Sequence, residues 1–346
     1  RSRAAKRQSD KRIQKKVYNS LNTPIHLFIH YSMSRKIVFS LCVLLCGALI
    51  ALNGEAAEAA RSGFALWQNS VMPALLPFFV CTGLMRKLGL ISLGNPAALM
   101  ALSFISGAPG GARLCAGIYG NSTQDNTVMA ASLNALSPMF ITGAFASSML
   151  RCPQAAIPIV SAQLIAMLVF FIVALRTTPM PTRIEARDEK VNAGVLFAAS
   201  VTEAAASLIS ICGMIVFFSV LMRMLEITGL LSIIAWPLKQ LILLLNGPGH
   251  AAEVMICAAV EAATGASRIA DAALSLREAT ALAAFAFSFG GLCIMAQSMI
   301  FMRIDIKKYL ICKLAQGILA ALIAYLLFPF CCNGMQSVTA EPEIME

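Results

Sequence analysis

Long apolar runs are the feature that most constrains this chain. A helix needs about 20 apolar residues to cross a bilayer. The sequence holds seven runs near that length, at 37–53, 64–85, 127–150, 154–175, 194–222, 279–301 and 309–330. Only 13% of the 346 residues are charged, about half the ~25% share of soluble domains. We therefore expect an all-α polytopic membrane protein with about seven spans, embedded in a lipid bilayer.

Two further apolar stretches are interrupted by helix-breaking residues. The stretch 97–118 contains Gly-Ala-Pro-Gly-Gly at 107–111, and the stretch 229–266 contains Asn-Gly-Pro-Gly at 246–249 and Thr264-Gly265. Non-helical backbone at membrane depth persists only where protein or a water-filled cavity satisfies it. We therefore expect two re-entrant helical hairpins, at about 97–118 and 229–266.

Basic residues are concentrated at the start of the chain. Residues 1–36 hold ten Lys/Arg and one acid, a net +9, whereas the other 310 residues hold 17 Lys/Arg and 16 Asp/Glu, a net +1. Basic segments beside a first span stay in the cytoplasm. We expect residues 1–36 to be a cytoplasmic leader, of which 1–32 would not be native if Met33 is the true start. No motif accompanies the basic run, so a nucleic-acid partner is not expected.

The same order of features occurs twice along the chain. A first membrane helix at 37–53 precedes a repeat over 54–175, a cytoplasmic linker at 176–193, a second repeat over 194–330 and a tail at 331–346. Charge placement gives the two repeats opposite orientations, with each cluster of bases on the cytoplasmic side. We expect inverted repeats, each with a hairpin and a broken transmembrane helix, as in transporters that bind at the midplane.

The hairpin tips supply candidate residues for binding an anion. Helix N-termini attract negative charge, and an arginine fork suits a carboxylate. Two arginines in equivalent places, Arg113 and Arg268, would together suit a dicarboxylate. The alternative is that both lie at the membrane surface or act as topology signals. The tip candidates are Ser106, Gly107, Pro109, Gly110, Gly111 and Arg113 in the first repeat, and Thr264, Gly265, Ser267 and Arg268 in the second.

The broken spans add polar groups that could orient a substrate. Asn134 and Ser137 precede Pro138 in the first repeat, and Ser288, Gly290 and Gln297 take the corresponding place in the second. The alternative reading is polar contacts between packed helices.

Two acids fall within apolar segments, where they are costly and often mark ion pathways. We expect Glu203, inside the span 194–222, and Glu261, at the tip of the second hairpin, to be candidates for coupling to protons or sodium. A salt bridge between Glu261 and Arg268 is the alternative. No metal-ligand cluster and no catalytic motif is present in the sequence, so neither a cofactor nor an enzyme is expected.

Four motifs occur in an order that resembles a known family. They are Gly-Ala-Pro-Gly-Gly-Ala-Arg at 107–113, Leu-Asn-Ala-Leu-Ser-Pro-Met-Phe-Ile at 133–141, Glu-Ala-Ala-Thr-Gly at 261–265, and Phe-Gly-Gly-Leu at 289–292 with Ala296-Gln297. Over roughly residues 60–330 the chain resembles the YlbJ (SpoVV) family of sporulation integral membrane proteins, which carry the nucleoside-recognition (Gate) domain. One departure is the short segment between Leu90 and Ala97, which trims the first hairpin.

The resemblance implies a fold akin to the concentrative nucleoside transporters and a role in moving dipicolinic acid across the outer forespore membrane. Dipicolinate is a small aromatic dianion, which fits the two-arginine hypothesis. We therefore expect a transporter of a small organic anion in the cell membrane, with its N-terminus in the cytoplasm and Arg113 and Arg268 holding carboxylates. A nucleoside or other small-metabolite transporter of the same fold, and a non-transporting sporulation scaffold, are the alternatives. The sequence leaves a homo-oligomer open.

Overall fold

The computed structural model describes residues 35–88, 95–119, 125–178, 193–244 and 247–332. The chain divides into two compact units, Arg1–Gly54 and Glu55–Glu346, and each is described by itself. Most of the predicted leader, linker and tail lies outside the described residues.

The described chain is helical throughout, with no strand in the ranges given above. The first unit contains α2 (Arg35–Ala51). The elements that follow along the chain are α3 (Asn53–Leu66), η1 (Trp67–Val71), α4 (Met72–Lys87), α5 (Pro96–Ser106), α6 (Gly110–Tyr119), α7 (Thr127–Leu133), η2 (Phe140–Met149), η3 (Pro153–Ala155), α8 (Ala156–Thr177), α9 (Ala193–Ile227), α10 (Leu230–Leu244), α11 (Ala251–Val260), α12 (Ala262–Asp271), α13 (Leu276–Phe289), α14 (Gly291–Met299) and α15 (Ile306–Cys331).

Four stretches of the described chain are long and apolar enough to cross a membrane: Pro153–Thr177, Gly194–Ile227, Leu276–Met299 and Ile306–Cys331. A fifth arises if Cys42–Ala51 and Asn53–Asn69 form one broken span. This is fewer than the seven predicted spans. The run 127–150 is divided between α7 and η2, and α4 follows the π-helical turn η1, so neither offers one long helix.

The two halves share an order of elements. A helix pair is followed by an interrupted helix and then by one long helix: α5 and α6, α7 and η2, and α8 in the first half, and α11 and α12, α13 and α14, and α15 in the second. The second pair meets at Glu261, and Gly265 lies inside α12. The predicted range 229–266 takes in α10 as well as α11 and the start of α12. The opposite orientation of the repeats and the re-entrant placement of the pairs stay predictions.

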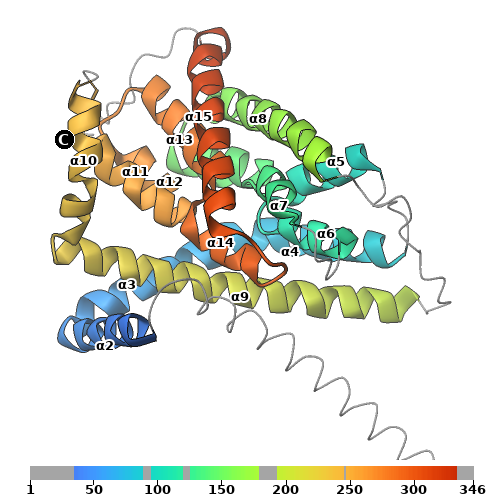
Figure 1. Cartoon of the computed structure of the whole chain (residues 1–346), viewed down its shortest axis with the longest axis horizontal. Helices are drawn as coiled ribbons and strands as arrows, with labels where there is room; N and C mark the ends of the chain where they lie inside the picture. Colours follow the sequence, from blue (N-terminus) through green and yellow to red (C-terminus); the bar gives the residue numbers. More distant parts are fainter. Residues whose placement is uncertain (1–34, 89–94, 120–124, 179–192, 245–246, 333–346) are drawn as a thin grey trace, which may run out of the picture. The chain divides into compact units, whose positions relative to one another are not determined.

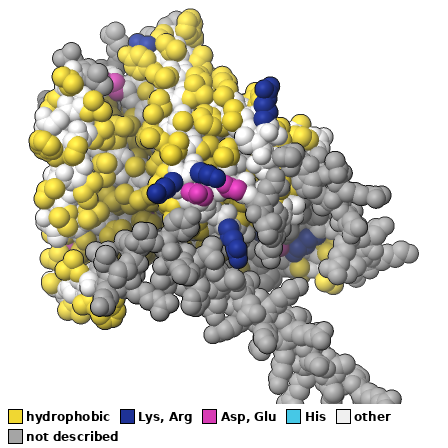
Figure 2. Space-filling view, in the orientation of Figure 1, with side chains coloured by type: hydrophobic (Ala, Val, Ile, Leu, Met, Phe, Trp, Pro, Cys, Tyr) yellow, Lys and Arg dark blue, Asp and Glu magenta, His cyan; other side chains and the backbone are white. Residues whose placement is uncertain are grey.

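The largest hydrophobic core joins η2, α8, α13 and α15. Phe287 of α13 packs edge-on against Phe145 of η2, with ring centroids 4.9 Å apart. In Figure 1, α15 lies beside α8 and α13, and α9 runs along α4. Large apolar side chains such as Leu322 and Phe330 point outward from α15. Figure 2 shows hydrophobic side chains over most of the described surface in view, with charges in a few small groups, as expected for a lipid-facing protein.

Candidate functional site

The first helix break, residues 134–137, separates α7 from η2. Pro138 explains part of it, because proline has no N–H to donate to the carbonyl four residues earlier, that of Asn134. A freed carbonyl in a membrane protein must find another donor.

Three separate elements supply the missing donors at the first helix break. Lys313 Nζ of α15 donates to the Asn134 carbonyl at 2.6 Å. The Ala108 amide of the first hairpin tip donates to the Ala135 carbonyl at 2.6 Å. Gln163 Nε2 of α8 donates to the Leu136 carbonyl at 2.6 Å. The break is thus a fixed feature that the protein satisfies internally.

The Asn134 side chain ties the two halves together. Its Nδ2 donates to Ser298 Oγ at 2.5 Å and to Tyr309 Oη at 2.8 Å, all of them buried. The Leu136 amide donates to the Phe287 carbonyl at 3.1 Å, which places this break against the end of α13. The predicted site residue Asn134 therefore holds the halves together and does not line a cavity described below.

The second helix break, Gly290 and Gly291, separates α13 from α14. Their φ angles of 82° and 77° lie in the region that favours glycine. The second hairpin tip packs closely here, since a Cβ on Gly291 would lie 3.1 Å from the Val260 carbonyl. At that tip the buried Glu261 carboxylate accepts from the Ala263 and Thr264 amides at 2.9 and 2.5 Å and so caps α12.

A small central pocket lies where the two hairpin tips and breaks meet. Its polar lining comes from three predicted residues, Ser137, Glu261 and Gln297. Ala108, in the first hairpin tip, also lines the pocket. The rest of its lining is apolar, and its volume is about 60 Å³. A water needs about 10–15 Å³ by this measure, so in this conformation the pocket suits a few waters but no dicarboxylate.

A larger cavity, the arginine cleft, has a volume of about 570 Å³. Arg268 pairs with Glu226, and Arg223 pairs with Glu55 through a 2.6 Å contact. Ser219 and Thr264 lie within hydrogen-bonding distance, 3.4 Å between their hydroxyl oxygens. The polar and charged residues that line the cleft are Glu58, Ser62, Ser219, Arg223, Glu226, Thr264, Ser267 and Arg268.

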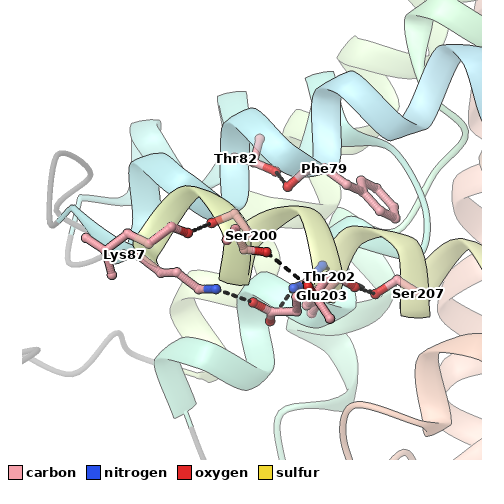
Figure 3. A network of polar contacts seen from close by, with 10 residues as sticks. Phe79, Thr82, Lys87, Ser200, Thr202, Glu203 and Ser207 are labelled. Carbon is pink, nitrogen blue, oxygen red and sulfur yellow. Dashed lines mark hydrogen bonds and ion pairs between the residues drawn. The ribbon is translucent and has the colours of Figure 1, made fainter. Parts of the chain in front are cut away.

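Arg113 lies in a different cluster, between α4, α6 and α9. It pairs with Glu203, whose other oxygen lies 3.1 Å from Lys87 Nζ. Arg113 Nη1 also lies 3.5 Å from Ser207 Oγ. Figure 3 shows Lys87 reaching toward Glu203 beside Ser207. Glu203 is therefore the shared counter-charge of two cations.

The two predicted arginines do not converge on one site. Their partners Glu203 and Glu226 lie on the same helix, 226 − 203 = 23 residues apart. At 1.5 Å per residue that is about 35 Å along α9. One small dicarboxylate cannot bridge that distance. The structure thus corrects the paired-arginine hypothesis: Arg268 lies in the arginine cleft and Arg113 does not. The alternative Glu261–Arg268 salt bridge is not formed either: Arg268 pairs with Glu226, and the Glu261 carboxylate accepts from the Ala263 and Thr264 amides.

The other predicted residues lie inside the packing around the breaks. Gly107 and Gly111 leave room for Ser137 and Leu133, and Gly265 leaves room for Ala258. Ser288 is fully buried and its hydroxyl has no hydrogen-bond partner among the described residues. Ser106, Pro109 and Gly110 form the first hairpin tip, where Ser106 Oγ donates to the Ser103 carbonyl at 3.4 Å.

Replacing Glu203 with glutamine is expected to destabilise the protein by about 1–3 kcal/mol, because two partly buried cations lose their shared counter-charge. The partial exposure of this cluster keeps the loss below that of a fully buried pair. The measurement is the free energy of unfolding in detergent. The double variant Glu203→Gln, Arg113→Met should recover part of the lost stability, because one of the two uncompensated cations is then removed. If Glu203→Gln abolished dipicolinate uptake but left the free energy of unfolding unchanged, that result would instead favour the predicted coupling role of Glu203.

Several residues that contact the first break were not identified as site residues from the sequence. Lys313, Gln316 and Tyr309 of α15 and Gln163 of α8 each contact a residue of the first break or its flank. A lone lysine within the run 309–330 was the available signal, since charges inside a span are usually functional. The signal for Arg223 was weak: it ends a Leu-Met-Arg sequence at 221–223 that also occurs at 84–86.

The long apolar helices, and the lack of strands in the described part of the chain, define an integral membrane protein of the helical class. The chain is similar to the sporulation integral membrane protein YlbJ of Bacillus subtilis (strain 168), at 24% identity over an alignment of 339 positions that covers 84% of this chain and 82% of that protein. This similarity supports the resemblance predicted from the motifs. No family model and no solved structure matches the chain. The nucleoside-recognition domain and the relation to nucleoside transporters stay predictions.

Proposed function

We propose that the protein is a sporulation membrane protein that transports a small organic anion, dipicolinate, across the outer forespore membrane, with its N-terminus in the cytoplasm. The observation that carries this proposal is the arginine cleft, which combines two guanidinium groups with the hydroxyls of Ser219, Thr264 and Ser267. Its volume of about 570 Å³ lies within the range of small-molecule sites, ~300–1,000 Å³.

The chemistry of the cleft suits an aromatic dicarboxylate. Guanidinium forks bind carboxylates through two parallel hydrogen bonds. Leu66, Met149 and Met222 offer apolar surface for a ring on the same lining. Because Glu226 and Glu55 pair with the arginines, the substrate carboxylates would exchange with these glutamates. Binding would therefore be moderate and reversible, which a transporter requires.

The two helix breaks support transport over catalysis or a passive structural role. Each break sits against a hairpin tip, and a hydrogen bond from the Leu136 amide joins the first break to the end of α13. Interrupted helices at corresponding places of two halves are typical of transporter binding regions. We propose that movement of the tips against the breaks opens the arginine cleft alternately to the two sides.

Uptake of labelled dipicolinate into proteoliposomes, measured beside labelled uridine, tests the proposal. We expect saturable dipicolinate uptake, competed by unlabelled dipicolinate, and no saturable uridine uptake. Uridine uptake alone would replace the substrate with a nucleoside. Uptake of neither solute by protein shown to be folded would contradict transport and favour a scaffold.

A further inference from the structure

Lys313 is a lysine without exposed surface, near the start of the apolar helix α15. Its exposed fraction is 0%. An ammonium group is costly to bury in a membrane protein unless its charge is matched locally. The groups around Lys313 therefore indicate how the protein stabilises this buried ammonium.

The contacts of Lys313 are neutral oxygens. Its Nζ lies 2.6 Å from the Asn134 carbonyl and 3.0 Å from Gln316 Oε1. No carboxylate of the described residues forms an ion pair with it. Asn134 Oδ1 is a further buried oxygen, and it has no hydrogen-bond partner among those residues.

Carbonyl and amide oxygens are also the ligands that bind hard metal cations. Here Pro138 frees the Asn134 carbonyl, and the Gln316 amide turns its oxygen to Lys313 while its Nε2 donates to the Ser132 carbonyl at 3.1 Å. We infer that the Lys313 ammonium occupies a monovalent-cation site at the first helix break. The protein then needs no bound sodium there to stabilise the break.

Gln163 provides a matched control on the other long helix. It is the eighth residue of α8, since 163 − 156 = 7, as Lys313 is of α15, since 313 − 306 = 7. Gln163 is equally buried and donates to the Leu136 carbonyl, two residues beyond Asn134. The two side chains therefore support the same break and differ in charge.

If the protein is a transporter, as proposed, the Lys313 ammonium would make transport independent of sodium at this site. That consequence rests on the proposed function. The test measures stability and not uptake, so failure of one can be told from failure of the other. The thermal unfolding midpoint of the purified full chain is compared in sodium chloride and in choline chloride of equal ionic strength. The proteins compared are wild type, Lys313→Ala, Lys313→Met and Gln163→Ala.

We expect the wild-type midpoint to be the same in both salts. Lys313→Ala should unfold at a lower temperature in choline and recover by about 3–5 °C in sodium, because sodium enters the vacated site. Lys313→Met fills the space without a charge, so its unfolding midpoint should be below that of wild type in both salts. The midpoint of Gln163→Ala should also be below that of wild type in both salts.

Two results would overturn the inference. One is a saturable rise of the wild-type midpoint with sodium that persists in Lys313→Ala, because sodium would then bind elsewhere. The other is a Lys313→Ala midpoint that sodium does not raise. If Lys313→Ala does not fold, Lys313→Ser, which adds a hydroxyl ligand, is measured in the same way. Failure of both variants to fold in sodium also counts against the inference, because sodium could not then replace the ammonium.

Discussion

Replacing Arg268 with alanine is expected to raise the KM for dipicolinate uptake by about 100-fold. Arg268 lines the arginine cleft beside Thr264 and Ser267, and a charge-assisted bidentate bond to a carboxylate contributes on the order of 2–3 kcal/mol. Each 1.4 kcal/mol corresponds to a factor of about ten in affinity. Initial rates of uptake into proteoliposomes, measured over a range of dipicolinate concentrations, give KM and the maximal rate for each variant.

Arg113→Ala is the matched control for that experiment. Arg113 occupies the same place after its hairpin glycine as Arg268 does, three residues after Gly110 and Gly265 respectively. Its charge is engaged by Glu203, about 35 Å along α9 from Glu226. Arg113→Ala should therefore lower stability and leave the KM near the wild-type value. An equal rise of KM in both variants would contradict our assignment and restore a site shared by the two arginines.

Arg268→Lys separates charge from geometry at the same position. Lysine keeps the positive charge but lacks the planar fork that matches a carboxylate. We expect a KM between those of wild type and Arg268→Ala. A KM equal to that of Arg268→Ala would mean that the fork, and not the charge, dominates recognition.

The helix breaks could be predicted because their causes are local. Pro138 removes a donor wherever it stands in a helix, and two consecutive glycines at 290 and 291 allow positive φ angles. Both properties belong to the residues themselves. The sequence therefore located both breaks, and it located the first helix pair close to its observed bounds, Pro96–Ser106 and Gly110–Tyr119.

The charge partners could not be predicted, because they depend on how distant segments meet. Arg113 and Arg268 look alike in the sequence, each following a glycine by three residues. Only the path of α9, which carries both Glu203 and Glu226, shows that they belong to separate clusters. The donor Lys313 lies 179 residues from the carbonyl of Asn134 that it contacts, so no local pattern links them.

The second helix pair was predicted over 229–266, with its tip between Glu261 and Gly265. The glycine and proline residues at 246–249 and the glycine at 265 interrupt the apolar run and suggested breaks in its helices. In the structure Gly265 sits within α12, where it permits close packing against α11. The turn falls at Glu261, whose carboxylate caps the next helix by accepting from two backbone amides. A glycine inside a helix marked a close contact here, not a break.

That close contact leads to the second large effect: Gly265→Ala is expected to destabilise the protein by about 3 kcal/mol or more. A Cβ at this position would lie 2.6 Å from Ala258 Cβ and 2.9 Å from the Ala258 backbone nitrogen. Backbone cannot move aside as a flexible side chain can, so α11 and α12 must separate, and overpacking of this kind is costly. The thermal unfolding midpoint in detergent measures the loss.

Gly213→Ala is the control for this substitution. Gly213 also lies inside a helix, α9, but a Cβ there would meet no atom within 4 Å. Alanine is the better helix former by about 1 kcal/mol, so this variant should be as stable as wild type or slightly more stable. Separation of α11 from α12 would also shift the tip at Glu261 away from the second helix break, so Gly265→Ala should lose dipicolinate uptake even where it folds. A Gly265→Ala protein as stable as Gly213→Ala would show that the helix pair is not packed as described.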